Sequence, residues 1–249
     1  MNRMVSTTAN YELATQYLHD WVIAIINQAG RCGISATNLD GWAANRYQFQ
    51  TNVSSADPVF IWLNGHGNIE KLAGQDGEII LDLGNNNILS GRVVYAFSCL
   101  TASELGPSSV SKGCTAYIGY SDEFVFVYDN TAPYPLRDKY AQWFMQAGVE
   151  VGSSLLRGET AGQSLVRSQS LFDTAIGYWN TSSDPVAPSM LACLYQDKNC
   201  QRLLGSESAR VNTGYYPMPL SVTQAGLGGL ILPFLILTGL YYLYKGRFR

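Results

Sequence analysis

The chain has 249 residues, of which 47% are hydrophobic and only 14% are charged, and its formal net charge is -3. This length suffices for one well-packed core, or for one domain with an appendage. Phosphate binding needs clustered positive charge, and no dense run of Lys and Arg precedes the last few residues, so the composition argues against a nucleic-acid partner.

The first thirty residues carry no signal-peptide pattern, because their one apolar run, 21–26, is short and lies behind Asp20. Apolar residues recur there at helical spacing instead. This predicts an amphipathic helix that Asn10 caps and Gly30 ends, with His19 at its surface or boundary. Residues 31–57 are polar and mixed, and no element is predicted in them.

Short apolar runs separated by Gly- and Asn-rich turns follow, and they predict strands at 59–63, 79–83, 93–97, 114–120 and 124–128. The runs at 59–63 and 93–97 are almost continuously apolar, as in strands that are buried on both faces of a sheet covered by helices. Two helices are expected next, one over 136–148 that ends at Gly148 and one after Gly158. The pattern predicts an α/β fold with a mostly parallel central sheet flanked by helices.

The segment 225–244 is twenty residues long and contains no charge. As a helix it spans roughly 30 Å, the thickness of the hydrocarbon layer of a bilayer. We therefore predict a globular domain at 1–205, a linker at 206–223, a transmembrane helix at 224–245 and a short basic tail at 246–249. The alternative is a buried C-terminal core helix.

The predicted anchor is single-pass and C-terminal. No N-terminal signal would export the domain, and a reducing compartment preserves thiols, so we expect the domain on the cytoplasmic side. Lys245, Arg247 and Arg249 favour the opposite orientation, because positive flanks prefer the cytoplasm.

The five cysteines are odd in number and loosely spaced, which argues against a disulfide framework: Cys32, Cys99, Cys114, Cys193 and Cys200. A structural zinc site is not expected, because His19 and His66 are the only histidines and no C-x-x-C pair occurs. We expect no metal and no other cofactor. Most of the thiols are predicted to be small buried hydrophobes.

Two reactive side chains each follow a buried strand. His66 comes three residues after the run at 59–63, and Cys99 comes two residues after the run at 93–97. Ligands bind at this edge of open α/β sheets. If the strands are neighbours, the imidazole can take the proton of the thiol and later protonate a leaving amine. Gly67 leaves its N–H unobstructed, so it and the Cys99 amide could form an oxyanion hole.

Each residue taken alone also fits an inert role, His66 in an ordinary turn and Cys99 as a buried thiol. Together, an apolar strand with His-Gly and an apolar strand with Ser-Cys resemble the caspase-like (clan CD) cysteine peptidases. The interval of 33 residues between His66 and Cys99 is most similar to gingipain-like members. The resemblance covers about residues 55–180.

This resemblance implies a caspase-like sandwich that acts on a protein or peptide. It makes His66 the general base and acid, Cys99 the nucleophile, and the amides of Gly67 and Cys99 the oxyanion donors. Some members add a carboxylate that orients the histidine, and Asp57 and Glu70 are the nearest candidates in sequence.

Asp122 and Glu123 follow the strand after the cysteine, and acidic residues there would favour Arg or Lys in the substrate. An ordinary solvated turn is the alternative. The sequence thus predicts a membrane-anchored cysteine endopeptidase. A transpeptidase that uses the same dyad and an inactive caspase-like membrane scaffold are the alternatives, and the sequence does not indicate an oligomeric state.

Overall fold

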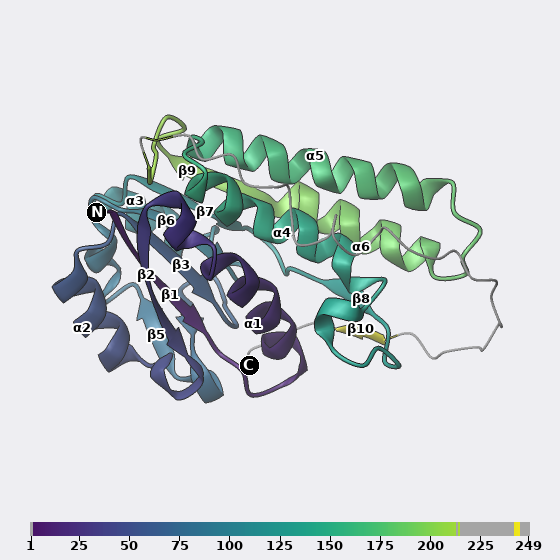
Figure 1. Cartoon of the computed structure of the whole chain (residues 1–249), viewed down its shortest axis with the longest axis horizontal. Coiled ribbons are helices and arrows are strands. Elements are labelled where there is room, and N and C mark those ends of the chain that lie inside the picture. The colour runs from purple at the N-terminus through teal and green to yellow at the C-terminus, as the bar shows by residue number, and fades with distance from the viewer. Residues whose placement is uncertain (1, 213, 215–241, 245–249) are drawn as a thin grey trace.

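A computed structural model of the chain describes residues 2–212, 214 and 242–244 (Figure 1). Its centre is a six-stranded sheet with the order β2-β1-β3-β6-β7-β9. The strands are β1 (Asn2–Thr8), β2 (Ile34–Asp40), β3 (Phe60–Asn64), β6 (Val93–Phe97), β7 (Ala116–Tyr120) and β9 (Gln201–Gly205). Neighbours are parallel except at β7 and β9, so the predicted mostly parallel sheet is confirmed.

Helices cover both faces of this sheet. One face packs against α1 (Leu13–Ile26), α4 (Ala141–Leu156), α5 (Ala161–Asn180) and α6 (Ala187–Cys200). The other face packs against α2 (Arg46–Ala56), α3 (Leu105–Ser111) and a hairpin of β4 (Lys71–Ala73) and β5 (Ile79–Asp82). Short 3₁₀ turns lie at Ala29–Cys32, Gly41–Ala43, Gln75–Gly77, Asn86–Leu89 and Pro135–Arg137.

The strands β3 and β6 lie where the apolar runs predict them, and every residue of both is buried. Alternate residues face the two cores: Trp62 and Tyr95 pack toward α1 and α4, whereas Leu63 and Ala96 pack toward α2. The run at 114–120 forms β7. The runs at 79–83 and 124–128 are strands outside the main sheet, as β5 and as β8 (Phe126–Tyr128).

The first two strands were not predicted. β1 lies between β2 and β3, yet three of its five buried residues, Ser6, Thr7 and Thr8, carry hydroxyls. Ser6 Oγ donates to Asn38 at 2.8 Å and Thr8 Oγ1 donates to Asp40 at 2.9 Å, so these polar groups are satisfied inside the sheet. A strand built this way has no apolar period to detect. β2 and α2, which lie within residues 31–57, likewise have no clear apolar period in their sequences.

The helix expected to end at Gly148 continues to Leu156 instead. Gly148 and Gly152 lie inside this helix and do not end it. Their missing side chains allow α4 to pack closely against the sheet. A Cβ atom on Gly148 would lie 2.3 Å from Phe97, and one on Gly152 would lie 2.1 Å from Trp62.

The first helix also differs from its prediction at both ends. Glu12, and not Asn10, is its N-cap, and its carboxylate accepts the N–H groups of Ala14 and Thr15. The helix ends at Ile26, before Gly30.

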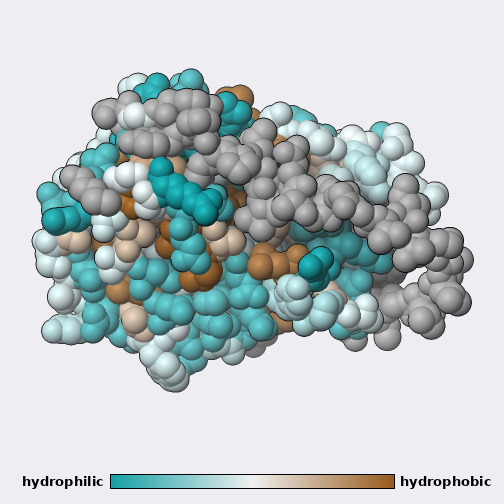
Figure 2. Space-filling model, in the orientation of Figure 1, coloured by the Kyte–Doolittle hydropathy of each residue, from teal (hydrophilic) through white to brown (hydrophobic). Residues whose placement is uncertain are grey.

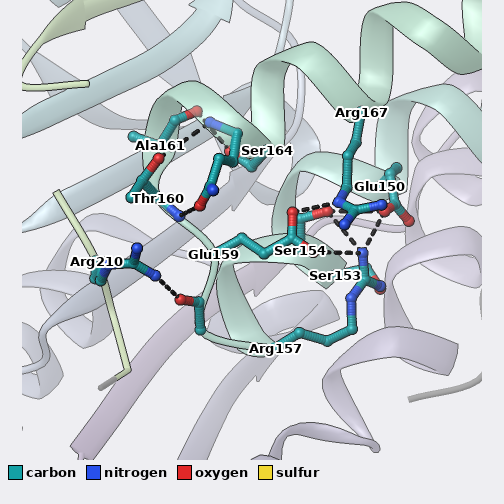
Figure 3. A network of polar contacts seen from close by, with 12 residues as sticks. Glu150, Ser153, Ser154, Arg157, Glu159, Thr160, Ala161, Ser164, Arg167 and Arg210 are labelled. Atoms are coloured by element: carbon teal, nitrogen blue, oxygen red, sulfur yellow. Dashed lines mark hydrogen bonds and ion pairs between the residues drawn. The ribbon is translucent and has the colours of Figure 1, made fainter. Parts of the chain in front are cut away.

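Residues 206–212, expected to begin a linker, are docked onto the domain. The Ala161 N–H donates to the Ala209 carbonyl at 2.8 Å, and Asn2 Nδ2 donates to the Val211 carbonyl at 2.8 Å. Arg210 donates to the Gly158 carbonyl (Figure 3). The preceding α6 and β9 were likewise missed, and they complete one face and one edge of the sheet.

A buried ion network lies where α4 meets α5 (Figure 3). Arg157 pairs with Glu150 and donates to Ser153 and Ser154 at 2.8 Å each. Glu159, two residues after Arg157, pairs with Arg167. Arg157 and Glu150 are both almost fully buried, so loss of either side chain would leave the other as an uncompensated buried charge.

The predicted transmembrane helix at 224–245 and tail at 246–249 lie outside the described residues, apart from 242–244. These three residues form strand β10 (Tyr242–Tyr244), which is antiparallel to β8, so the end of the expected helix is extended here. Within the described part of the chain, no helix combines the length and apolar character needed to cross a bilayer. Figure 2 shows a largely hydrophilic face with small hydrophobic patches, although few residues of the chain are charged.

Candidate active site

The candidate site lies at the carboxyl edge of the parallel strands. Asn64, the last residue of β3, is in register with Phe97, the last residue of β6. His66 and Cys99 each follow two residues later, on neighbouring loops, and both line one pocket. The structure therefore brings these two predicted side chains to one pocket.

A third residue joins them from the segment that follows β1, a strand that the sequence did not reveal. His66 Nε2 lies 3.0 Å from Glu12 Oε1. β1 pairs with β3, so the segment after Thr8 meets the loop after Asn64 at the same edge of the sheet. Glu12 thus holds the imidazole while it caps α1, and such a partner fixes the orientation and tautomer of a histidine.

The carboxylates suggested by proximity in sequence do not fill this role. Asp57 ends α2 and pairs with Arg92 at 2.7 Å, and Glu70 lies exposed in a turn. His19 pairs with Asp20 and Asp40 on the outer side of α1, as expected of a boundary residue. The signal that could have indicated Glu12 is its spacing to Thr15, which forms a capping box.

Gly67 lies directly against the segment that carries the thiol. A Cβ atom at this position would lie 2.3 Å from Ser98 Oγ and 2.5 Å from the Cys99 carbonyl oxygen. Any larger residue would therefore push the two loops apart. The two amides predicted as oxyanion donors belong to these touching segments of backbone.

The thiol of Cys99 is enclosed in this structure. The residue is 8% exposed, and its Sγ donates to the Phe124 carbonyl at 3.7 Å. Burial raises the pKa of the Cys99 thiol to about 12, so little thiolate exists at neutral pH in this state. Leu100, the next residue, has a φ of 62°, which is rare for a branched side chain and stores strain beside the thiol.

The pocket between the two side chains is small. Its volume of about 20 Å³ admits about one water molecule. Aromatic rings of Phe97, Phe124 and Phe126 form much of its wall. A peptide can reach Cys99 only if this wall moves.

Asp122 and Glu123 lie on the loop that borders the cysteine segment. The Asp122 carbonyl accepts the Leu100 N–H at 3.0 Å, and Asp122 is exposed whereas Glu123 is partly buried. Their side chains are not part of the pocket wall. The structure thus brings both residues near Cys99, and their part in substrate binding stays a prediction.

All five cysteines are buried, as expected of small hydrophobes. Among the described residues, no group of three or more His, Cys, Asp or Glu side chains could hold a metal ion. In comparisons with known proteins, no family model and no curated protein matches this chain.

Proposed function

We propose that this chain is a cysteine endopeptidase of the caspase-like kind, which hydrolyses peptide bonds through Cys99 and His66. The observation that carries the proposal is their shared pocket at the ends of two adjacent parallel strands. The hydrogen bond from His66 Nε2 to Glu12 adds to it, because a fixed imidazole is what a cysteine nucleophile requires.

The chemistry follows from this arrangement. With Nε2 turned to Glu12, His66 takes the thiol proton on Nδ1 while Cys99 Sγ attacks the peptide carbonyl. The N–H groups of Gly67 and Cys99 stabilise the negative oxygen. His66 then gives its proton to the leaving amine, and water, deprotonated by His66, hydrolyses the thioester.

The enclosed state of Cys99 makes this a gated enzyme in our proposal. The thiol loses its burial when the wall formed by Phe124 opens for a peptide, and its pKa then falls towards the ordinary range. Asp122 and Glu123, on the same loop, would lie beside the entering chain. Their charge favours Arg or Lys in the substrate.

The uncharged segment 225–244 supports a location for this activity at a membrane surface, with the domain on the cytoplasmic side. Protease treatment of sealed vesicles tests that part separately. The domain is expected to be protected from protease added outside cytoplasm-filled vesicles, and its digestion in intact vesicles would contradict the cytoplasmic location.

The test of the enzyme is peptide cleavage by the full-length protein, followed by mass spectrometry. Cys99→Ala and His66→Ala should each reduce cleavage by about a thousandfold or more. Cys114→Ala, which alters a buried thiol outside the pocket, should retain activity. Full activity in either dyad variant would remove the proposal.

Two further outcomes correspond to the alternatives. Products joined to an added amine would indicate a transpeptidase with the same dyad. Failure of a thiol-reactive peptide probe to label Cys99 at neutral pH, together with absent cleavage, would favour an inactive scaffold.

A further inference from the structure

The loop between β7 and β8, residues 121–125, forms the wall of the pocket beside the nucleophile. It is bonded to Cys99 and to Leu100, the residue after it, at one place each. Cys99 Sγ donates to the Phe124 carbonyl at 3.7 Å, and the Leu100 N–H donates to the Asp122 carbonyl at 3.0 Å. The position of this loop therefore determines how Cys99 is held.

The C-terminal end of α6 holds the same loop from behind. Asp197 Oδ1 accepts the Val125 N–H at 2.9 Å, and Gln196 Nε2 donates to the Glu123 carbonyl at 2.9 Å. Val125 follows Phe124 directly, so the Asp197 bond is one residue away from the carbonyl that receives the thiol. The loop is thus fixed between the cysteine segment and α6.

The Asp197 side chain is unusual for its place. The residue is fully buried, and its Oδ2 has no hydrogen-bond partner among the described residues. Burial raises the pKa of this carboxyl well above its ordinary range, because it disfavours the charged form. A buried carboxyl with one unpartnered oxygen is costly, and the bond that its other oxygen makes here is to the Val125 N–H.

We propose that Asp197 is a positioning residue for Cys99: through Val125 it holds the Phe124 carbonyl against the thiol and keeps the pocket wall closed. The proposal deepens, and for its catalytic meaning rests on, the peptidase function. It assigns α6, a helix that contributes no residue to the pocket wall, control over the reactivity of the nucleophile.

The titratable groups around Cys99 are Asp197 and Cys200 of α6, Glu123 of the loop and His66 across the pocket. Asp197→Ala removes the first of these groups and loosens the loop that carries Glu123, whereas it leaves Cys200 and His66 unchanged. Loosening the loop exposes the thiol, so its reactivity should rise and its titration should move down towards the ordinary value of 9.0.

The experiment measures alkylation of Cys99 by iodoacetamide in the full-length protein in detergent, from pH 7 to 11, with the modified peptide quantified by mass spectrometry. Asp197→Ala should raise the rate at pH 8 by about tenfold and lower the midpoint of the pH profile. Asp197→Asn keeps an oxygen for the Val125 N–H, so its rate should stay within about twofold of the parent.

Two more variants separate positioning from general loosening. Met190→Ala makes a cavity elsewhere on the buried face of α6. It should lower the melting temperature about as much as Asp197→Ala does, while leaving the pH profile of Cys99 alkylation unchanged. Gln196→Ala removes the bond to the Glu123 carbonyl from a partly buried position, and should raise the rate by about threefold even if Asp197→Ala does not fold.

The proposal is overturned if Asp197→Ala reacts no faster than Met190→Ala, or if Asp197→Asn reacts as fast as Asp197→Ala. Where Asp197→Ala is insoluble, an unchanged profile in Gln196→Ala overturns it. Alkylation needs no substrate, so a chain that cleaves no peptide but shows these rate differences would contradict the peptidase function alone.

Discussion

Glu12 Oε1 lies 3.0 Å from His66 Nε2, and the same carboxylate accepts the N–H groups that begin α1. One side chain therefore connects the stability of a helix to the orientation of the proposed base. Comparison with a helix cap elsewhere in the chain separates the two roles.

Glu12→Ala removes both interactions. We expect the free energy of unfolding to fall by about 1 kcal/mol, as for other lost N-caps, and peptide turnover to fall by about tenfold or more. Asn45→Ala is the matched control, since Asn45 caps α2 by accepting the Gln48 N–H at 2.9 Å and does not line the pocket. It should lose similar stability at unchanged turnover. Equal turnover in the two variants would show that Glu12 acts only as a cap.

Breaking the buried network between α4 and α5 should cost far more than breaking a surface pair. Arg157→Ala leaves the Glu150 carboxylate without its guanidinium in a buried site, so we expect a loss of about 3–5 kcal/mol in urea unfolding. Lys198→Ala breaks the more exposed pair with Asp173 and should cost about 0–1 kcal/mol. Similar losses in the two variants would mean that the Glu150 carboxylate is well solvated after the Arg157→Ala mutation.

Two glycines in helices should respond to alanine with opposite signs. In Gly148→Ala the new Cβ would lie 2.3 Å from Phe97, so we expect a loss of about 1–3 kcal/mol and lower turnover, because Phe97 lines the pocket. In Gly177→Ala, on an exposed face of α5, no atom lies within 4 Å of the new Cβ. There the helix propensity of alanine should add up to about 1 kcal/mol. Thermal unfolding of both proteins measures the contrast.

Buried thiols should make the fold sensitive to alkali. Burial raises the pKa of Cys114 to about 12 from its ordinary 9.0. Below pH 9 the thiol is protonated in both states. Above it the unfolded chain loses the proton first, so the free energy of unfolding falls as pH rises from about 9 towards 12, by up to about 1.4 kcal/mol per pH unit for each such group.

Cys114→Ala should reduce this slope in urea unfolding between pH 8 and 11. Met190→Ala, which removes a buried side chain without a titratable group, should lower stability by the same amount at every pH. Parallel slopes in all three proteins would contradict the assignment of the alkaline loss to Cys114.

The parts of the site that the sequence revealed are those that follow apolar strands. The runs before His66 and Cys99 are buried on both faces, so their residue types alone report a central strand. β1 could not be read this way, because its buried Ser6, Thr7 and Thr8 depend on partners in neighbouring strands. Glu12 was missed with it, since only the pairing of β1 with β3 brings residue 12 beside residue 66.

For a related reason, the role of Asp197 was not predicted and Gly148 was wrongly predicted to end a helix. Neither a buried acid in a helix nor a glycine under an aromatic ring has a local pattern, because its partner is distant in the chain. Val125 is 72 residues from Asp197, and only the packed fold joins them. Local sequence predicted the two strand ends, whereas the supports behind them are tertiary contacts.

Gly67→Ala tests the proposed oxyanion donors directly. The added Cβ would lie 2.5 Å from the Cys99 carbonyl oxygen and 2.3 Å from Ser98 Oγ, so the loop that carries the Gly67 N–H must shift away from the thiol. Loss of one oxyanion donor costs about a hundredfold or more in turnover, and we expect that loss here. Gly30→Ala adds a Cβ with no atom within 4 Å and should leave turnover unchanged. Alkylation of a thiol needs no oxyanion donor, so iodoacetamide should still reach Cys99 in Gly67→Ala at the parental rate or faster. Parental turnover in this variant would remove Gly67 from the oxyanion hole while leaving Cys99 and His66 as the proposed nucleophile and base.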